Sequence, residues 1–571
     1  MAKKATKAVK KAAKSGSGKQ VKRVYFFGAG KAEGKADQKL LLGGKGANPA
    51  DMTLAGLPVP PGFTITTETC ADYNTLGGKF PNGLLDEVKQ HLARTEKASG
   101  KKFGDPKNPL LLAVRSGAAV SMPGMMDTVL NIGLNDVVVE GLAQLTNNAR
   151  FAYDCYRRLI NMFGDTVMGV PHEEFEHALT EVKKSVGVTA DTDLRTADLK
   201  LVVEKYKEIY KQHTGDSFPQ DGLKQLALSI EAVFKSWMGD RAIAYRRIND
   251  IKGLAGTAVN VQTMVFGNMG DDSATGVAFT RNPSTGENKF YGEFLVNAQG
   301  EDVVAGIRTP LDCDTEMGKW SKKSWAELLD VKKKLEKRYK DVQDFEFTIE
   351  RGKLYMLQTR SGKRNAVAAV KIAADMVREK LIDETTAILR VDPATPDQLP
   401  HKPTAPKPGK PASARGRPAS PGAAMGKLAF TAEEAHERAH NGEKALLIRK
   451  ETSPEDVQGM HSAAGILTST GGMTSHAAVV ARGWGKTCVV GAGALQIDEK
   501  ARKVTIGEKS YGPDDLISID GSTGEIIEGA VPLVDPEMTG PFAQIMKWAD
   551  KYRTLKVRTN ADSPADATKA R

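Results

Sequence analysis

Apolar and polar positions along this chain follow a pattern typical of a protein with several mixed domains. Short apolar runs that predict buried strands lie at residues 24–27, 110–114, 258–266, 276–280 and 345–358. Between the second and third of these runs, residues 141–245 carry apolar positions at helical spacing, most clearly at 151–163 and 199–210. This order predicts an α+β domain over residues 24–390 with a mainly helical insertion.

A Pro-rich stretch separates this region from a second domain. Nine prolines fall within residues 391–421, mixed with Lys, Ala and Gly, and such a segment acts as an extended, semi-rigid linker. Short apolar runs punctuated by Gly then predict a compact α/β domain over residues 422–534. Residues 535–571 begin with the pattern of a connecting helix. A chain of 571 residues is long enough for this many domains.

Charge adds little to the functional picture. The formal net charge is +11, but residues 1–23 hold nine of the 81 basic residues and no acidic one. The rest of the chain has 72 basic and 70 acidic residues and is nearly neutral. We interpret residues 1–23 as a disordered basic tail. Nucleic-acid binding would depend on that tail alone, and we do not expect it. The absence of an apolar run of about 18 residues predicts no membrane span.

Four cysteines far apart in the sequence, Cys70, Cys155, Cys313 and Cys488, have neither paired nor metal-ligand spacing. This usage fits a reducing compartment, and we expect a cytoplasmic protein.

The strongest chemical signal is the string Gly-Gly-Met-Thr-Ser-His at residues 471–476. The glycines allow a tight turn, after which Thr474 or Ser475 can cap a helix that begins near His476. The positive end of the helix dipole disfavours the imidazolium, which leaves a ring nitrogen free to attack phosphorus. The same exposed amides would stabilise a phosphorylated ring. Taken alone, the string also fits an ordinary capping or core histidine.

Two segments are candidates for phosphate binding, although the N-terminal domain has no Walker A or G-x-G-x-x-G sequence. Residues 42–48 form a Gly-rich turn that carries Lys45, which suits a polyphosphate, although taken alone the string fits a plain turn better. Arg115 follows the predicted strand at 110–114, and residues 124–127 form a Met-rich loop that could close over a ligand.

A predicted hairpin supplies candidate metal ligands. Alternation along its first strand places Asp344 and Glu346 on one face, and Gln358 and Arg360 share a face of the second strand. Carboxylate and amide oxygens suit Mg²⁺, and the guanidinium suits phosphate. An exposed polar hairpin is the alternative interpretation.

Together these strings resemble the pyruvate, phosphate dikinase family. Residues 24–390 resemble its ATP-grasp domain, residues 422–534 its phosphohistidine domain, and residues 535–571 a linker helix with the start of its phosphoenolpyruvate/pyruvate barrel. The implied fold is multidomain α+β: an ATP-grasp domain with a helical insertion, a swivelling α/β phosphohistidine domain, and only the first strand and helix of a TIM barrel.

The resemblance also implies roles for individual residues. His476 is the catalytic nucleophile, and Thr474 is a regulatory phosphorylation site. Residues implied to contact ATP are Lys45, Arg115, Arg158, Gln262, Met264, Val265, Thr275, Glu293 and Arg360. Residues implied to bind Mg²⁺ are Asp344, Glu346 and Gln358.

The implied reaction is the ATP- and phosphate-dependent phosphorylation of His476, with release of AMP and pyrophosphate. In the family the phosphohistidine then reaches a barrel that phosphorylates pyruvate. A complete barrel needs about 250 residues. We therefore expect no phosphoenolpyruvate synthesis without a separate barrel subunit, and the expected partners are ATP, phosphate, such a barrel, and a kinase or phosphatase that acts on Thr474.

Two other functions compete with this one. A phosphoenolpyruvate synthase would use water in place of phosphate, but its string typically has Arg-Thr-Cys before the histidine, where this chain has Met-Thr-Ser. A non-catalytic phosphocarrier is the second alternative, and the intact ATP-site motifs count against it.

Overall fold

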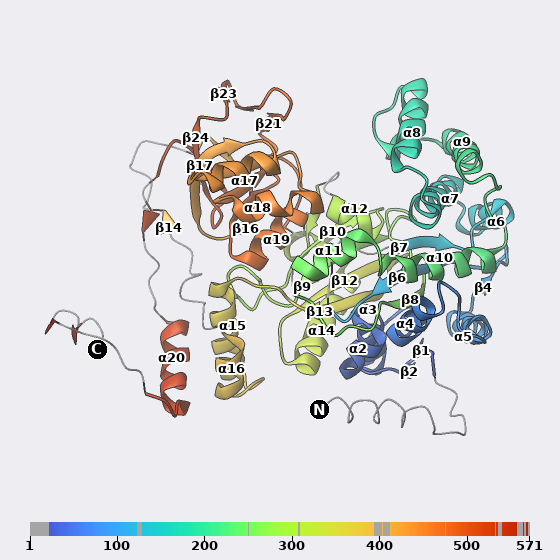
Figure 1. Ribbon diagram of the computed structural model, residues 1–571, viewed down its shortest axis with the longest axis horizontal. Coiled ribbons are helices and arrows are strands. Elements are labelled where there is room, and N and C mark those ends of the chain that lie inside the picture. Colours follow the sequence, from blue (N-terminus) through green and yellow to red (C-terminus); the bar gives the residue numbers. More distant parts are fainter. Residues whose placement is uncertain are drawn as a thin grey trace, which may run out of the picture. The chain divides into compact units, whose positions relative to one another are not determined.

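The computed structural model describes residues 22–120, 122, 128–248, 250–305, 309–392, 402–403, 412–473, 475–531, 533–534, 540–556, 563–564 and 567–568. Most of the predicted basic tail, the Met-rich loop, most of the Pro-rich linker, Thr474 and most of the expected barrel segment therefore lie outside the described residues. By packing, the chain divides into two compact units, residues 1–264 and 265–571. Figure 1 colours both along the sequence.

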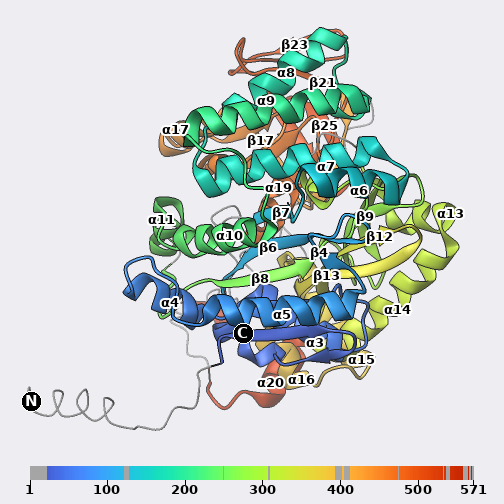
Figure 2. The same cartoon turned by 90° about the vertical axis from the view of Figure 1, so that its right-hand side faces the viewer.

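The first unit is built on an antiparallel sheet of six strands. Their order is β2 (Lys31–Ala32), β1 (Val24–Gly28), β3 (Gly62–Ile65), β8 (Ala258–Thr263), β6 (Leu112–Gly117) and β7 (Thr128–Ile132). Helices that pack on these strands include α3 (Gly44–Leu54), α4 (Thr67–Thr75), α5 (Leu84–Ser99), α10 (Gly222–Ser236) and, on β7, α7 (Ala149–Met162). Figure 2 shows α5 running along the sheet. The strands predicted at 24–27, 110–114 and in the first part of 258–266 are confirmed.

The predicted helical insertion is also confirmed. It contains α6 (Asp136–Thr146), α7 (Ala149–Met162), α8 (His172–Val186) and α9 (Thr196–Thr214), and α11 (Asp240–Ile248) follows α10. The side chains of Asn135 and Asn148 accept backbone hydrogen bonds at the starts of α6 and α7, as expected of N-caps. Helices α8 and α9 lie side by side beyond α7 (Figures 1 and 2), and the rings of Phe175 and Tyr206 meet edge to face between them.

The second unit begins with an antiparallel sheet of five strands. Their order is β11 (Leu311–Asp312), β10 (Tyr291–Val296), β9 (Ala274–Phe279), β12 (Gln343–Glu350) and β13 (Lys353–Ser361). Helices of this region are α12 (Gly300–Ala305), α13 (Gly318–Trp320), α14 (Lys322–Tyr339), α15 (Ala366–Arg378) and α16 (Glu384–Arg390). Helix α20 (Pro541–Tyr552) packs on α15 and α16 through Ile545 and Trp548. The predicted strands at 276–280 and 345–358 are confirmed.

A sheet of eight strands forms the rest of this unit. Their order is β15 (Ala414–Arg415), β25 (Glu525–Glu528), β24 (Leu516–Asp520), β17 (Ala423–Ala429), β18 (Ala445–Arg449), β19 (Gly465–Thr468), β20 (Thr487–Val490) and β16 (Arg417–Ser420). Strands β17 to β20 are parallel, and helices α17 (Ala432–His440), α18 (Val457–Ser462) and α19 (His476–Trp484) connect them. The α/β character predicted for residues 422–534 is confirmed.

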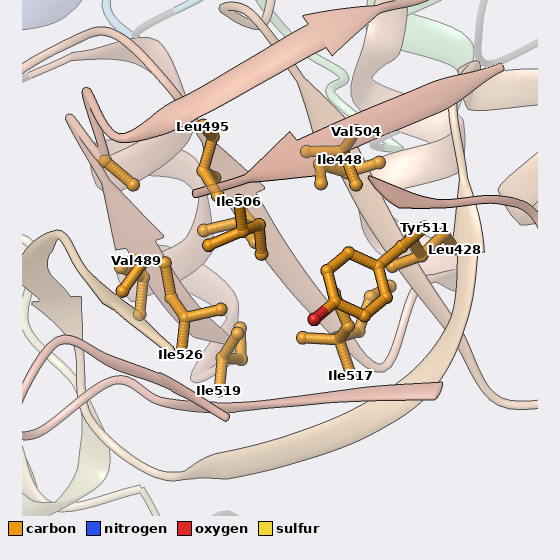
Figure 3. Close-up of a cluster of buried hydrophobic side chains, with 14 of the residues drawn as sticks. Leu428, Ile448, Val489, Leu495, Val504, Ile506, Tyr511, Ile517, Ile519 and Ile526 are labelled. Atoms are coloured by element: carbon orange, nitrogen blue, oxygen red, sulfur yellow. The ribbon is translucent and has the colours of Figure 1, made fainter. Parts of the chain in front are cut away.

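A small antiparallel sheet covers one side of this domain. Its strands are β21 (Leu495–Asp498), β22 (Lys503–Ile506) and β23 (Lys509–Tyr511). Val504, Ile506 and Tyr511 face a buried cluster of aliphatic side chains that includes Ile517 and Ile519 (Figure 3). Burial of β-branched side chains from two sheets gives this domain a core of its own. None of the described helices has the length and apolar character to cross a membrane.

Short elements complete the fold. They are α2 (Lys39–Leu42), β4 (Lys102–Phe103), β5 (Pro109–Leu110), β14 (Lys402–Pro403) and β26 (Leu533–Val534), and β14 pairs with β26.

Candidate active site

His476 is the first residue of helix α19, as the sequence predicted. Gly471 has a φ of 92°, which a residue with a side chain rarely adopts, and the chain turns there before the helix. Ser475 occupies the N-cap position with extended backbone angles, but its buried hydroxyl has no hydrogen-bond partner among the described residues. The other candidate cap, Thr474, lies outside them. The first-turn amides of α19 therefore lack a described side-chain cap.

The imidazole of His476 is held at one ring nitrogen. Its Nδ1 lies 2.9 Å from the hydroxyl oxygen of Thr452, in a loop that follows β18. Burial lowers the pKa of His476 from its ordinary value, and the nearby Asp456 carboxylate opposes this shift. The ring is therefore neutral at pH 7, the form required of a nucleophile. The expected neutral state thus has burial as a cause in addition to the helix dipole.

A second group of contacts links the histidine loop to the five-stranded sheet. Arg417 on β16 donates from Nη1 to Glu293 Oε1 at 2.5 Å and from Nη2 to the carbonyl oxygen of Pro310 at 3.1 Å. The side chain of Glu293 on β10 is 3% exposed. A Cβ built on Gly472 would overlap the Glu293 carboxylate and come within 2.8 Å of Pro310. The loop can lie this close to β10 only because residue 472 has no side chain.

The β12–β13 hairpin brings the predicted metal ligands together. Its register places Asp344 opposite Arg360 and Glu346 opposite Gln358. Arg360 Nε donates to Asp344 Oδ2 at 2.7 Å, whereas Asp344 Oδ1 and Gln358 Oε1 are buried with no hydrogen-bond partner among the described residues. Burial raises the pKa of Asp344, with Arg360 acting against that shift.

These oxygens fit a magnesium ion. Two buried oxygens without a partner and the neighbouring Glu346 carboxylate share one end of the hairpin. Mg²⁺ is commonly bound through one or two carboxylates and completes its shell with water and substrate phosphates. The described residues contain no cluster of three or more His, Cys, Asp or Glu with metal-binding geometry, so a site here depends on the Gln358 amide and on a phosphate ligand.

In the first unit, Lys45 and Arg115 lie on one side of the six-stranded sheet. Lys45 is in the first turn of α3, which starts after Gly43 with a φ of 65°, and Gly44 N donates to the carbonyl oxygen of Ala118 at 2.9 Å. A Cβ built on Gly117 would lie 3.3 Å from Lys45 Cβ. Arg115 shares a face of β6 with Gly117 because it is two residues away. Two cations and the N-terminus of α3 therefore lie on the same side of the sheet, an arrangement that suits an anion.

Arg158 has a different environment from these two cations. It lies on α7, where its Nε donates to Asp154 Oδ2 at 3.1 Å. Asp154 also accepts from Arg157 at 2.9 Å, and Arg157 donates in turn to Asp191 at 3.0 Å. Burial opposes ionisation of Asp154, but these arginines hold its pKa below the ordinary value. The network fixes the direction of Arg158 within the helical insertion, and its phosphate contact stays a prediction.

The other predicted nucleotide contacts are mostly buried in sheet structure. Gln262 donates to the carbonyl oxygen of Pro60 at 3.1 Å, and the Thr275 hydroxyl lies 3.2 Å from the carbonyl oxygen of Phe347. Met264 is buried at the end of the first unit, and Val265, which begins the second, is half-buried. Their contacts with adenine, and that of Glu293, stay predictions.

Sequence patterns missed several residues of this site. Thr452, Asp456 and Arg417 are 20 to 59 positions before His476, and their side chains belong to ordinary loop and strand segments. A Ser-Pro-Glu-Asp string at residues 453–456 signals a helix start, which the structure has, but says nothing about the imidazole. Only tertiary structure brings them together, through the packing of α19 on β16, β19 and β20 and the pairing of β18 with β19.

Comparison with known proteins gives consistent results. The family profile described as "Pyruvate phosphate dikinase, AMP/ATP-binding domain" matches residues 39–97, 75–319 and 312–381. The profile described as "PEP-utilising enzyme, mobile domain" matches residues 442–524.

Full-length relatives agree with these profiles. The chain is 55% identical over 552 residues to pyruvate, phosphate dikinase 1, chloroplastic, of Arabidopsis thaliana, covering 96% of this chain and 57% of the relative. It is 54% identical over 553 residues to pyruvate, phosphate dikinase of Clostridium symbiosum, covering 96% and 63%. For the enzyme of that name from Rhizobium meliloti the identity is 53% over 561 residues, covering 96% and 62%. The chain thus spans about three-fifths of the length of these relatives.

Proposed function

This chain belongs to the pyruvate, phosphate dikinase family, and from that premise we propose that it uses ATP and inorganic phosphate to phosphorylate its own His476. The observation that carries the proposal is the state of the imidazole. It heads α19, its pKa is lowered by burial, and one ring nitrogen is engaged by Thr452. A neutral, oriented imidazole beside helix amides that have no side-chain cap among the described residues suits both the attack on phosphorus and the charged product.

The proposed chemistry consists of two phosphoryl transfers. In the first, Nε2 bonds to the β-phosphorus of ATP while the bond from that phosphorus to the oxygen bridging the α-phosphate breaks, and AMP leaves. In the second, an oxygen of inorganic phosphate attacks the terminal phosphorus of the pyrophosphoryl group. The remaining bridging bond breaks, pyrophosphate leaves, and one phosphoryl group stays on Nε2. In both steps positioning and charge neutralisation supply most of the catalysis.

The tautomer of His476 follows from the Thr452 contact. Attack through Nε2 requires a lone pair on that nitrogen, so the proton must be on Nδ1. Nδ1–H then donates to the Thr452 oxygen 2.9 Å away. Thr452 would thereby fix both the tautomer and the direction of the ring throughout the transfer.

We propose phosphate-binding roles for cations of each unit taken by itself. Lys45, Arg115 and the first amides of α3 are the candidates in the first unit, with Arg158 as a further one. Arg360 is the candidate on the β12–β13 hairpin of the second unit, where its pairing with Asp344 pre-orients the guanidinium. These are the roles that the resemblance to an ATP-grasp domain implies.

Asp344, Glu346 and Gln358 would hold Mg²⁺, which when bound neutralises phosphate charge. Asp344 Oδ1 and Gln358 Oε1 support this assignment, because both are buried without a hydrogen-bond partner among the described residues. Ionised Asp344 is disfavoured by burial in the absence of a cation, so the fold leaves it ready to bind one.

Transfer from phosphohistidine to pyruvate is a further part of the proposal. It requires a phosphoenolpyruvate/pyruvate barrel, which we propose as a partner domain or subunit, and a swivel of the phosphohistidine domain about the Pro-rich linker. A kinase or phosphatase that acts on Thr474 is the proposed regulator. We propose a cytoplasmic location, noting that the Arabidopsis relative is described as chloroplastic.

The test is self-labelling of the full chain with Mg²⁺ and ATP carrying a labelled β-phosphate. Wild type should gain an acid-labile, base-stable label, and His476→Ala should gain none. His461→Ala is the matched control, because His461 lies in the same domain but contacts the Trp484 ring instead of the reactive loop. Pyrophosphate should form only when phosphate is added. Pyrophosphate-free turnover with water would favour the synthase alternative, and an unlabelled wild type would contradict the proposal.

A further inference from the structure

Arg482 is buried to an extent that is unusual for an arginine. It lies on α19, six residues after His476, and is 1% exposed. Its Nη1 donates to the carbonyl oxygen of Ala419 at 2.9 Å, and its Nη2 donates to the carbonyl oxygen of Met473 at 2.5 Å. Among the described residues, its hydrogen-bond acceptors are thus backbone carbonyls and not a carboxylate. The Asp344 carboxylate is near enough to interact with its charge but does not accept a hydrogen bond from it. Burying a guanidinium without a hydrogen-bonded carboxylate is costly, so this placement needs a physical reason.

One hydrogen bond ties Arg482 to the reactive loop. Met473 is three residues before His476, in the segment between the glycine turn and the start of α19. The guanidinium therefore connects the last turn of α19 to the loop that precedes its first turn. Ser475 makes no described capping hydrogen bond, so the Arg482–Met473 contact is a described side-chain hydrogen bond that holds the segment before the helix.

The remaining contacts tie the same guanidinium to the five-stranded sheet. Arg482 Cζ lies 5.8 Å from the ring centroid of Phe279 on β9 and 6.0 Å from that of Tyr291 on β10. The Ala419 carbonyl oxygen that accepts from Arg482 also accepts from the Ser284 hydroxyl at 3.3 Å, just beyond β9. Strand β9 pairs with β12, which carries Asp344. One cation thus contacts both the histidine loop and the sheet with the candidate metal site.

We propose that Arg482 is a positioning residue that makes the geometry of the histidine loop depend on docking of the phosphohistidine domain. When the domain lies on β9 and β10, the Phe279 and Tyr291 rings exclude water from the guanidinium and attract its charge. In that dry environment its hydrogen bonds to Ala419 and Met473 are stronger. When the domain leaves, water reaches the guanidinium and competes for those carbonyls, and the loop loosens.

This inference rests on the proposed phosphorylation of His476. Its consequence is that the imidazole has its reactive position when the phosphohistidine domain is docked where ATP is bound. It loses that position when the domain moves away from the sheet. A nucleophile that is ordered only in the docked state is positioned for the phosphoryl donor bound there and for no other.

The test compares ATP with phosphoramidate, a small phosphoryl donor that needs no ATP site. In full-length Arg482→Gln, ATP-driven labelling of His476 at saturating MgATP should slow at least tenfold, while the ATP dissociation constant and phosphoramidate labelling stay at wild-type values. Arg482→Lys, which keeps a cation, should recover part of the rate. Arg438→Gln is the matched control, since Arg438 is a mostly buried arginine of the same domain that pairs with Glu434 and Glu443.

A second variant approaches the contact from the other side. Tyr291→Leu removes one ring without changing the phosphohistidine domain, and it should lower ATP-driven labelling alone. The inference is overturned if Arg482→Gln or Tyr291→Leu labels from ATP at the wild-type rate, or if both donors lose rate equally, which would mean a purely structural role. If wild type accepts phosphate from phosphoramidate but not from ATP, the proposed function itself fails.

Discussion

At the scale of single residues, the state of His476 depends on two kinds of neighbour. The residues packed around the ring lower its pKa by removing water, and Thr452 fixes one nitrogen. The sequence string predicted the reactive residue and the helix start. It could not predict Thr452, because that contact joins residues 24 positions apart through the parallel pairing of β18 and β19.

The lowered pKa predicts the pH dependence of self-labelling. Only the neutral imidazole attacks, and the lowered pKa leaves a larger neutral fraction at each acidic pH than an ordinary histidine, whose pKa is about 6.5, would have. The decline of the rate at saturating MgATP should therefore be centred below pH 6.5. The measurement is a pH–rate profile of His476 labelling, with MgATP affinity determined at each pH as the control. A decline centred at or above pH 6.5 would show that burial does not lower this pKa.

At the scale of elements, the β12–β13 hairpin shows which features follow from the alternation of residues in the sequence and which follow from packing. Alternation predicted which of its polar residues share a face, and the register places Asp344 opposite Arg360. The pattern left open whether the hairpin is an exposed polar one. Packing against β9 buries Asp344 and leaves one carboxylate oxygen without a partner, which is the feature that suits a cation.

Replacement of Asp344 by Asn should raise stability and abolish activity together. Because burial raises the folded-state pKa of Asp344, the ionised form destabilises the fold at pH 7. Asp344→Asn should therefore raise the ligand-free melting temperature, by an amount that shrinks as the pH falls toward about 4, where the unfolded carboxyl is protonated. Labelling should fall about 10²–10³-fold, the usual loss when a charge-stabilising group is removed.

The control for this variant is Asp375→Asn, measured by thermal unfolding at the same pH values. Asp375 is buried like Asp344, but both of its carboxylate oxygens have cationic partners, Lys371 at 2.8 Å and Arg378, so its replacement should lower the melting temperature. Equal destabilisation by the two substitutions would contradict the metal-site interpretation of Asp344.

At the scale of the whole molecule, the proposed function requires that the phosphohistidine domain contact the sheet that carries the candidate metal ligands. Within the second unit the two are in close contact: Arg417 donates to Glu293, and Gly472 leaves no side chain between the loop and the Glu293 carboxylate. The Pro-rich segment predicts a connection that permits movement, but its composition does not specify where the domain docks. Glu293 illustrates this limit: sequence resemblance implies a nucleotide contact, whereas its described carboxylate accepts from Arg417.

A single methyl group at the docking surface should disturb this arrangement. The Cβ of Gly472→Ala would overlap the Glu293 carboxylate and approach Pro310 within 2.8 Å. Since overpacking costs about 1–3 kcal/mol, ATP-driven labelling should slow about tenfold. Gly493→Ala is the control, because a Cβ there has no neighbour within 4 Å among the described residues. Equal labelling rates in single-turnover assays of the two variants would mean that this close approach is not needed.

The sequence by itself predicted the helical insertion, the α/β character of the later domain, the β12–β13 hairpin with its candidate metal ligands and the helix that begins at the candidate nucleophile His476, because periodicity and short motifs are local properties of the chain. The tertiary structure decided what surrounds those residues: the burial that lowers the pKa of His476, its Thr452 partner, the buried state of Asp344 and the contacts of Arg482. These depend on side chains far apart in the sequence. Desolvation and hydrogen bonding arise only when packing removes water from between them.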